Sequence, residues 1–263
     1  MLLTDKVAFV TGGAGRLGRA IVTTFAREGA AVVLADLDPA RAEEAAREIS
    51  GKTNGRVIAV TGDVSQAADV ARMVEEATQA VGLPDILVNA HGIFPNVPVL
   101  DVDPDVWDRI FAVNVRGSML PAQALARRWI TNGVKGSIVN ISSGASRSAR
   151  AGGAGYAGSK AAVNLLTETL AIELGPHGIR VNAVAPGLIM DNVVTEESDA
   201  LHPYVNMTLR GTPMGRTGHA NDIAEAVAFL ASERSAWTTG AILEVTGGTH
   251  CGRTYMPTTQ GLR

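Results

Sequence analysis

Short apolar runs alternate along this chain with longer segments in which apolar residues recur at helical spacing. Most of the runs are apolar at every position, which is typical of strands that are covered on both faces of a parallel sheet. The runs occupy residues 7–10, 31–35, 57–60, 86–88, 137–141, 180–184 and 241–245. We therefore expect seven strands.

The intervening segments are predicted to be helices. The first helix stops at Gly29, a residue type that commonly follows a helix, and the second occupies residues 40–49, opened by Pro39 and followed by Gly51. The others are expected at residues 66–81, 104–129, 156–174 and 221–231, the second of these with a bend at Pro121. Strands that alternate with helices across short loops predict right-handed βαβ units and an α/β, doubly wound, seven-stranded parallel sheet with helices on both faces.

Length and composition narrow the class of protein. At 263 residues and 46% hydrophobic content, with no repeat or linker, we expect one domain spanning 1–263. The net charge of −3 lacks the basic excess of nucleic-acid binders. No apolar run approaches the ~18 residues of a membrane helix, and the charged N-terminal segment runs directly into a strand, so we expect no membrane partner, no signal peptide and a cytoplasmic location. A single cysteine, Cys251, excludes an internal disulfide and a multi-cysteine zinc site, and we expect no metal.

A glycine-rich turn, TGGAGRLG at residues 11–18, joins the first strand to the first helix. Such a turn lets the backbone and the helix N-terminus approach a pyrophosphate, although it also occurs as a flexible surface turn. Asp36 ends the second strand, where a carboxylate binds the adenosine ribose hydroxyls. Asp38 follows, and no Lys or Arg occurs between Ala31 and Ala40, so we expect NAD rather than NADP. Arg16 is the reservation, since its side chain can extend toward a 2′-phosphate.

Tyr156 and Lys160 lie four positions apart and so share one face of a helix. A nearby ammonium group lowers a tyrosine pKa toward the range that is useful for proton transfer. Such a pair alone is usually structural. It gains significance because Ser142 and Ser143 follow the buried strand at residues 137–141, at the edge where doubly wound sheets bind ligands.

Taken together, these residues resemble the short-chain dehydrogenase/reductase family, and the resemblance covers nearly the whole chain. It implies a Rossmann-like fold. The matching motifs, in order, are TGGAGRLG, Asp63-Val64, NAHG at 89–92, Asn114, Ser143, Tyr156 with Lys160, and Pro186-Gly187.

The resemblance implies four catalytic residues, Asn114, Ser143, Tyr156 and Lys160. Tyr156 would exchange a proton with the substrate oxygen and Ser143 would hydrogen-bond that oxygen. Lys160 would hold the nicotinamide ribose and depress the Tyr156 pKa, and Asn114 would anchor a water that relays protons. The implied cofactor-binding residues are Gly12, Arg16, Leu17, Gly18, Asp36, Asp63, Val64, Asn89, Gly92, Tyr156, Lys160, Pro186, Gly187 and Ile189.

The expected substrate pocket is formed by residues near the nicotinamide: His91, Phe94, Ala145, Arg150 and Leu188. His91 is also open to simple pairing with backbone, and Arg150 to plain solvation. Residues 191–213 correspond to the substrate lid of the family. The tail at residues 249–263 is open to either a contact with a neighbouring subunit or disorder, and we expect a homo-oligomer, a tetramer or a dimer.

The chain departs from the family pattern at four places. Arg16 replaces the middle glycine of the cofactor turn, Ala90-His91 replace an Asn-Ala pair, Asp191 stands where a threonine is frequent, and Thr246 replaces a common aspartate. A carboxylate at position 191 cannot donate the hydrogen bond that a threonine provides.

The resulting hypothesis is an NAD-dependent oxidoreductase that interconverts a secondary alcohol and its ketone by hydride transfer, with a tyrosine as acid and base. The alternatives are an NADP-dependent 3-oxoacyl-thioester reductase, a non-catalytic NAD-binding regulator, and an epimerase or dehydratase that returns the hydride to the same substrate. A polyol or sugar, a hydroxy acid, a cyclic or aromatic alcohol and an oxoacyl thioester all stay open as substrates.

Overall fold

The computed structural model describes residues 1–252 of the chain, and residues 253–263 lie outside the described part. The elements, in chain order, are β1 (Val7–Thr11), α1 (Arg16–Arg27), β2 (Ala31–Asp36), α2 (Pro39–Thr53), β3 (Val57–Thr61), α3 (Ala67–Val81), β4 (Ile86–Asn89), α4 (Pro104–Phe111), a π-helical turn (Ala112–Arg116), α5 (Gly117–Asn132), β5 (Ser137–Ile141), α6 (Ala154–Leu174), β6 (Arg180–Pro186), α7 (Pro203–Arg210), α8 (Ala220–Ala231) and β7 (Ile242–Val245).

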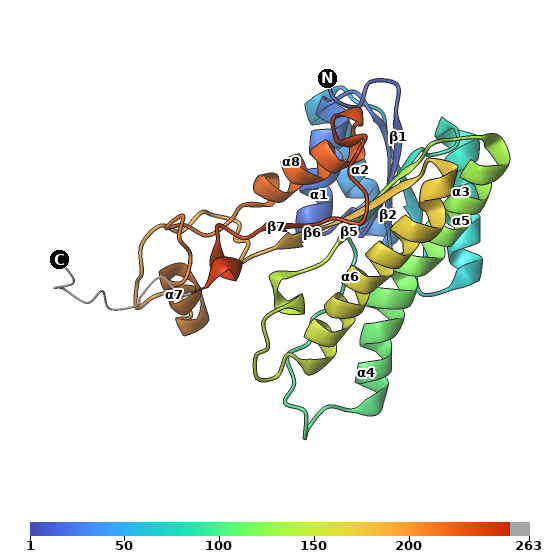
Figure 1. The fold of residues 1–263 in the computed structure, drawn as a ribbon. Helices are drawn as coiled ribbons and strands as arrows, with labels where there is room; N and C mark the ends of the chain where they lie inside the picture. The colour runs from blue at the N-terminus through green and yellow to red at the C-terminus, as the bar shows by residue number, and fades with distance from the viewer. Residues whose placement is uncertain (253–263) are drawn as a thin grey trace, which may run out of the picture.

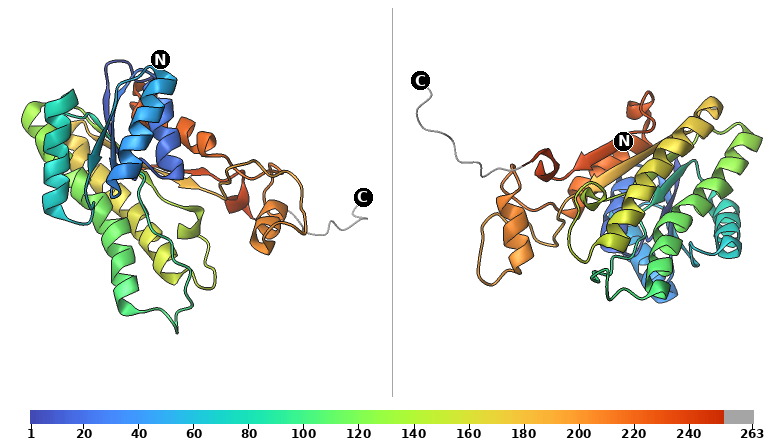
Figure 2. Two further views of the ribbon diagram at one scale, coloured as in Figure 1. Left: turned by 180° about the vertical axis from the view of Figure 1, so that it is seen from behind. Right: turned by 60° about the horizontal axis from the view of Figure 1, so that its bottom comes forward.

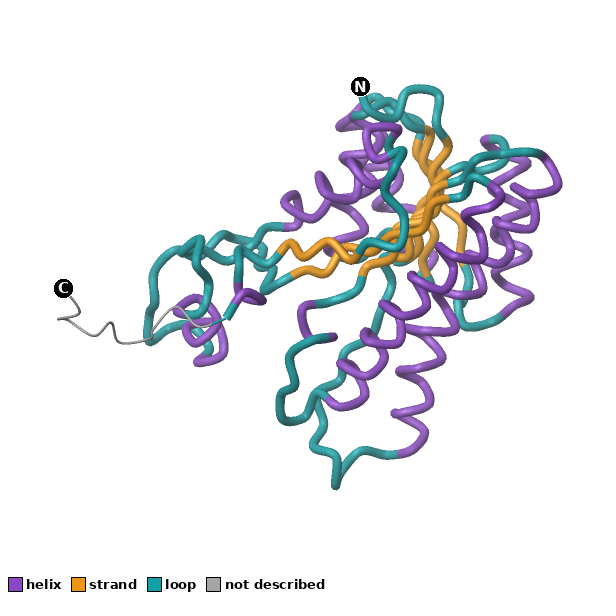
Figure 3. The backbone as a smooth tube through the Cα atoms, viewed as in Figure 1, coloured by secondary structure: helices purple, strands orange, loops and turns teal. Residues whose placement is uncertain are grey.

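The seven strands form one parallel sheet in the order β3-β2-β1-β4-β5-β6-β7, which confirms the predicted doubly wound arrangement. The chain builds outward from β1 to β3, then returns to the other side of β1 with β4. Figure 3 shows the strands, in orange, as one sheet with purple helices on both sides. β1 and β4 are therefore the pair at which the direction of winding changes. Ligands of such sheets bind in the crevice at the carboxyl ends of this pair.

Successive residues of each strand enter two different cores, one on each face of the sheet. In β1, Ala8 and Val10 pack with α1, α2 and α8, whereas Phe9 packs with α3, α5 and α6. The two helical layers are visible on either side of the sheet in Figures 1 and 2. This double coverage explains why most of the predicted runs are apolar at every position.

Two helix predictions were wrong in detail. The second helix does not end before Gly51 but runs through it to Thr53, and Asn54 ends it in the left-handed conformation at φ 55°. The predicted helix at residues 104–129 is two α-helices joined by the π-helical turn, so the irregularity lies before Pro121 rather than at it. Proline has no N–H to bond the carbonyl four residues earlier, and here that carbonyl belongs to Gly117, where the π turn gives way to α5.

Residues 191–213 contain one helix, α7, which projects from the body of the molecule beside the end of β7 (Figure 2). The residue that follows this segment is tied to the turn after β7, since the Met214 N–H donates to the Gly247 carbonyl at 3.1 Å. Of the predicted tail at residues 249–263, Thr249–Cys251 form a short 3₁₀ turn, and the contact expected of the remainder falls outside the described residues.

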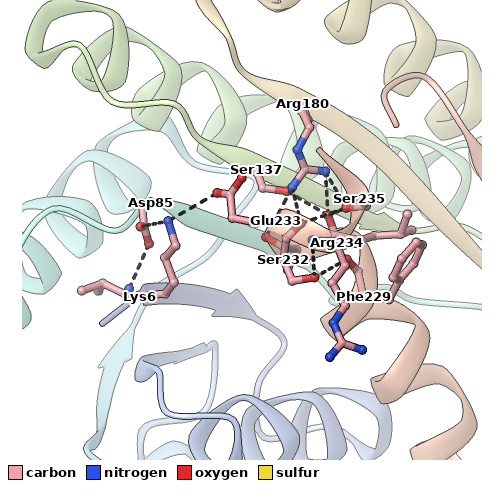
Figure 4. Close-up of polar contacts among 12 residues, drawn as sticks. Lys6, Asp85, Ser137, Arg180, Phe229, Ser232, Glu233, Arg234 and Ser235 are labelled. Atoms are coloured by element: carbon pink, nitrogen blue, oxygen red, sulfur yellow. Dashed lines mark hydrogen bonds and ion pairs between the residues drawn. The ribbon is translucent and has the colours of Figure 1, made fainter. Parts of the chain in front are cut away.

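A polar network fixes α8 to the amino ends of the strands, away from the crevice (Figure 4). The Arg180 guanidinium donates to the carbonyls of Leu230 and Ser232 and to the Ser235 hydroxyl, and Lys6 pairs with Asp85 and Glu233. This end of the sheet is thus occupied by structural contacts. Among the described residues, no helix combines the length and the apolar character needed to cross a membrane.

Candidate active site

The glycine turn leads from the end of β1 to the N-terminus of α1, as the sequence predicts. Gly12 has φ +63°, and a Cβ at this position would lie 2.6 Å from the Cα of His91. A Cβ on Gly18 would meet the Gly12 carbonyl oxygen. Both glycines are therefore required for the tight turn. The free N–H groups of the first turn of α1 (Arg16–Arg27) point out of this end of the helix, next to Leu17, and suit an anionic group.

Asp36 lies beside the glycine turn, and among residues 1–252 its carboxylate accepts hydrogen bonds from backbone N–H groups alone. Oδ2 accepts from the Ala14 N–H at 3.0 Å, whereas Oδ1 accepts from the N–H groups of Leu37 and Asp38 at 2.9 and 3.4 Å. The side chain is half-buried, so Oδ2 keeps a lone pair for a further donor such as a ribose hydroxyl. These residues fit the ribose of a dinucleotide.

Sequence reasoning missed a cation at this position. Arg41 donates to the Ala14 carbonyl at 3.2 Å, and its N–H is bonded by the Asp38 side chain that caps α2. The charge count between Ala31 and Ala40 stopped one residue short of Arg41. A helical turn brings that residue back beside Asp36.

Arg16 and Asp191, two of the departures from the family pattern, bind each other. The Arg16 Nε lies 2.7 Å from Asp191 Oδ1 and its Nη2 3.1 Å from Oδ2, while Nη1 donates to the Ile189 carbonyl at 3.1 Å. This bidentate pair connects the N-terminus of α1 to the segment after β6. Arg16 therefore points toward Asp191 in this structure and not toward Asp36.

His91 joins the ends of β1 and β4, and the structure shows the pairing with backbone that the sequence left open beside a pocket role. Its Nδ1 lies 2.6 Å from the Thr11 hydroxyl and its Nε2 3.1 Å from the Val113 carbonyl, so both ring nitrogens have protein partners. Burial, together with the nearby Lys160 charge, lowers the His91 pKa to about 3. The ring is therefore neutral, donating from Nε2 to the carbonyl and accepting at Nδ1 from Thr11.

The side chain of Asn89 is likewise structural. It is 1% exposed and donates to the Ser118 carbonyl and to Asn140 Oδ1. The resemblance implies a cofactor contact at Asn89, and the burial of its side chain leaves the backbone of this residue for such a contact.

Asn114 lies in the π-helical turn and is fully buried. Its Nδ2 donates to the Ile93 carbonyl and the Ser159 hydroxyl, and its Oδ1 accepts from the Ile93 N–H, each at 2.9 Å. Three of the four hydrogen-bonding positions of the amide are thus used within the protein. The side chain acts first as a clamp on the loop after β4, and one lone pair of Oδ1 remains for a water.

Lys160 and Gly92 lie beside Asn114. The Lys160 Nζ donates to the Ile141 carbonyl at 2.7 Å, at the end of β5. A Cβ on Gly92 would lie 3.4 Å from Asn114 Oδ1 and 3.5 Å from Lys160 Nζ. The absence of a side chain at Gly92 therefore keeps the space between the ammonium group and the amide open.

Ser143 and Tyr156 come together, and Ser142 does not join them. The Ser142 hydroxyl bonds Asn164 Oδ1 at 2.5 Å within the protein, whereas Ser143 hydrogen-bonds the Tyr156 phenol and also accepts from the Ala145 N–H. The Lys160 Nζ lies 6.0 Å from the centre of the Tyr156 ring. Three of the four expected catalytic side chains therefore surround one point at the carboxyl end of β5.

The expected depression of the Tyr156 pKa is absent. Burial raises the pKa of Tyr156 above its ordinary value and outweighs the hydrogen bond from Ser143 and the positive charge of Arg150, which lower it. Burial also lowers the pKa of Lys160 to about 8. The ammonium group is bonded to a carbonyl rather than to the phenol, and the cost of burial dominates both groups.

The remaining cofactor-side residues border the same crevice. Burial favours a higher Asp63 pKa, but hydrogen bonds from Ser65 and the Arg109 guanidinium outweigh it and lower the pKa. Val64 packs near Gly117. Pro186 ends β6 and is followed by Gly187, Leu188 and Ile189. Gly187 lies close to Thr246, because a Cβ on Gly187 would be 2.9 Å from the Thr246 Cα.

Phe94 and Arg150 lie on the substrate side of Tyr156. The Phe94 and Tyr156 rings meet edge to face, with centroids 6.2 Å apart. Ala145 follows Ser143 in a short 3₁₀ turn (Gly144–Ser146). Arg150 donates to the Tyr204 hydroxyl of α7, so the lid segment is joined to the segment that precedes α6.

Comparison with known proteins gives a consistent picture. The sequence profile of the family described as Enoyl-(Acyl carrier protein) reductase matches residues 12–250. The chain is 40% identical over 254 residues to the (3R)-3-hydroxyacyl-CoA dehydrogenase of Homo sapiens, covering 94% of this chain and 96% of the relative.

Two solved structures have the same fold. A short-chain type dehydrogenase/reductase from Mycobacterium marinum superposes with a TM-score of 0.86 at 32% identity, covering 95% of this chain and 97% of the other. A gluconate 5-dehydrogenase from Burkholderia cenocepacia, in complex with NADP and tartrate, superposes with a TM-score of 0.87 at 32% identity and the same coverage.

Proposed function

Because this chain belongs to the short-chain dehydrogenase/reductase family, we propose that it interconverts a secondary alcohol and its ketone with NAD, using Tyr156 as the proton-transfer group. The observation that carries the proposal is the convergence of Ser143, Tyr156 and Lys160 at the carboxyl end of β5, with Asn114 behind them. A bound nicotinamide supplies or accepts the hydride.

Each protein group has one task in this mechanism. In ketone reduction the Tyr156 phenol gives its proton to the substrate oxygen, and the Ser143 hydroxyl donates a hydrogen bond to the same oxygen. The raised Tyr156 pKa keeps the phenol protonated at neutral pH, which suits it as the donor. In alcohol oxidation the same phenol must first lose its proton, so this direction gains from higher pH.

Lys160 stabilises the resulting phenolate and holds the ribose of the cofactor. Its position beside Gly92 and Asn114 Oδ1 places the remaining lone pair of the amide within reach of a water next to the ammonium group. Protons then leave Tyr156 by way of this water. Asn114 is a positioning residue in this scheme, because its amide contacts Ile93 and Ser159.

The proposed preference for NAD rests on the charges around the ribose. Asp36 and Asp38 present carboxylates there, and Arg16 is engaged by Asp191. A 2′-phosphate would meet the two carboxylates. Arg41 is the opposing cation, and the similar gluconate 5-dehydrogenase was solved with NADP.

A second candidate is the NADP-dependent 3-oxoacyl-thioester reductase. The family profile and the human hydroxyacyl-CoA relative favour it, since both carry names of acyl-thioester enzymes. A non-catalytic regulator has no specific observation in its favour, because the four expected catalytic side chains are all present. No specific observation favours an epimerase either.

We also propose a cytoplasmic homo-oligomer, a dimer or tetramer. Leu165 and Ile172 are 65% and 78% exposed on α6, and Trp237 before β7 is fully exposed. Large apolar side chains on these two surfaces are suited to contacts between subunits. Sedimentation at micromolar concentration tests this assembly.

The central test combines cofactor titration with a substrate screen. NADH should bind more tightly than NADPH, and one class of secondary alcohols should reduce NAD. Tyr156→Phe should bind NADH as the wild type does but lose turnover by several orders of magnitude. Retention of turnover in Tyr156→Phe would show that another group transfers the proton. Tighter binding of NADPH would instead favour the thioester reductase.

A further inference from the structure

The segment between Ser143 and α6 carries two arginines that are engaged differently. Arg147 lies 3.6 Å from Glu244 of β7, a carboxylate whose side chain is only 8% exposed. For Arg150, by contrast, no carboxylate within residues 1–252 lies at ion-pair distance. Its charge is thus available to an anion from outside the chain.

Arg150 is held by an aromatic residue of the lid. Its Nη1 donates to the Tyr204 hydroxyl at 2.9 Å, and its Cζ lies 5.6 Å from the centre of the Tyr204 ring. Tyr204 belongs to the first turn of α7 (Pro203–Arg210). Because Tyr204 accepts in this hydrogen bond, its own O–H remains free to donate to a ligand.

This pair lies next to the proposed proton donor. In the turn directly before α6, the Gly153 N–H donates a hydrogen bond to the Arg150 carbonyl. Tyr156 is the third residue of that helix. Although burial has the larger effect, the Arg150 charge lowers the Tyr156 pKa and the Tyr204 phenol raises it, so both act on the phenol through space. On the other side, Phe94 packs its ring edge-on against Tyr156.

We propose that Arg150 and Tyr204 bind a carboxylate of the substrate, and that the substrate is a short 2- or 3-hydroxy acid or the corresponding oxo acid. This inference rests on the proposed function. A guanidinium group presents two parallel N–H donors that match a carboxylate, and the free Tyr204 O–H supplies a third. Arg150 and Tyr156 are six positions apart in the chain, and the hydrogen bond from the Gly153 N–H to the Arg150 carbonyl lies in the turn between them, so we assign a short acid whose carboxylate is one or two carbons from the reacting carbon.

The same geometry distinguishes this class from neutral substrates. A sugar, a polyol or an ester offers no counter-charge to the Arg150 guanidinium. A carboxylate neutralises Arg150 and also accepts a hydrogen bond from the Tyr204 hydroxyl of the lid. The carboxylate would therefore contribute affinity that a neutral group cannot provide.

The test compares acids with their methyl esters. Reduction of acetoacetate and methyl acetoacetate, and of pyruvate and methyl pyruvate, is measured with NADH and NADPH in the wild type, Arg150→Met and Arg150→Lys. We expect the wild type to favour one acid over its ester, and Arg150→Met to lose about 10- to 100-fold in kcat/KM for that acid, mainly through KM. The kcat/KM for the ester should fall by clearly less than that for the acid, and Arg150→Lys should recover part of the loss.

Arg147→Met is the matched control, since it removes one positive charge from the same segment and should keep the preference for the acid. Tyr204→Phe retains the ring but not the hydroxyl, and should lose a smaller part of the preference. Thermal unfolding of each variant checks that it is folded. Equal kcat/KM for acid and ester in the wild type, with no change in Arg150→Met, would overturn the inference and leave the proposed function standing.

Binding of malonate to the NADH complex, measured by calorimetry, gives a readout that does not need turnover. We expect binding in the wild type and in Arg147→Met, and its loss in Arg150→Met. Malonate binding that is absent from the wild type or unaffected in Arg150→Met would overturn the anion site. Malonate binding that depends on Arg150, in a protein that reduces neither acids nor esters, would support the anion site and contradict the proposed function.

Discussion

Replacing Lys160 with methionine separates the free-energy cost of its buried charge from its other contributions. The side chain is 4% exposed, and burial lowers its pKa from 10.5 to about 8. The unfolded chain therefore binds a proton at Lys160 more tightly than the folded chain does. Between pH 8 and pH 10.5 this difference makes stability rise with pH, and below pH 8 the full cost of the buried charge is present.

The magnitude follows from the size of the shift. One pKa unit corresponds to about 1.4 kcal/mol, so the cost at pH 7 is about 3 kcal/mol, of which less than about 1 kcal/mol remains at pH 10. Methionine has no such charge. Between pH 7 and pH 10, the free energy of unfolding of the wild type should therefore rise by about 2 to 3 kcal/mol relative to that of Lys160→Met.

Urea denaturation of both proteins at the two pH values measures this change. The variant lacks the hydrogen bond from Lys160 to the Ile141 carbonyl at both pH values, so this loss changes the stability difference between the two proteins equally at pH 7 and at pH 10. Lys135→Met, at an exposed lysine, controls for the general loss of a lysine. A difference between wild type and Lys160→Met that stays constant from pH 7 to pH 10 would refute the reasoning.

Three further predictions concern the cofactor side of the site. Asp36→Ala should weaken NADH binding about tenfold and shift the preference toward NADPH, measured by fluorescence titration of both; an unchanged ratio would contradict the role of this carboxylate in selectivity. Asp191→Asn should tighten NADH binding about two- to fivefold at low salt, because it frees Arg16 and removes a negative charge. A larger effect is not expected, since the ion pair is exposed, and equal affinity would show that Arg16 does not contact the cofactor. Asn114→Leu should lower the free energy of unfolding by about 2 to 4 kcal/mol, because it leaves the Ile93 backbone groups without partners, and a loss below about 0.5 kcal/mol in urea denaturation would argue against the clamp.

The strands were predictable because each one is formed by a local run of apolar residues. β5 at Ser137–Ile141 matches its predicted bounds, since all five residues are buried and four of them are apolar or small. The fifth, Asn140, satisfies its buried amide by hydrogen bonds with Asn89 and Thr167. The glycine turn was predictable for a similar reason. Gly12 and Gly18 occupy positions where a side chain has no room, and that requirement depends on neighbours in the same turn and at the next strand end.

What sequence reasoning missed depends on contacts between distant segments. Arg16 and Asp191 stood out separately as departures from the family pattern, but nothing in a separation of 175 residues indicates that they bind each other. The sign of the Tyr156 pKa shift was wrong because burial, which dominates it, is a property of the assembled site. The π turn escaped because the spacing of apolar residues distinguishes helix from strand but not one helical hydrogen-bond pattern from another.

The π-helical turn at Ala112–Arg116 also limits how this chain can change in length. A π-helical turn closes its hydrogen bonds over five residues rather than four, so it accommodates one residue more than the α-helical turn that it replaces. α4 packs on α6 on one side of the turn, and α5 packs on α3 on the other. A residue removed from within α4 or α5 would rotate one part of the helix by about 100° relative to the other, so one of these contacts would be lost. A residue removed from the π turn itself would restore α-helical hydrogen bonds and keep both contacts in register, but it would disturb the position of Asn114. Changes in length are therefore tolerated in this helix only at the turn that holds Asn114.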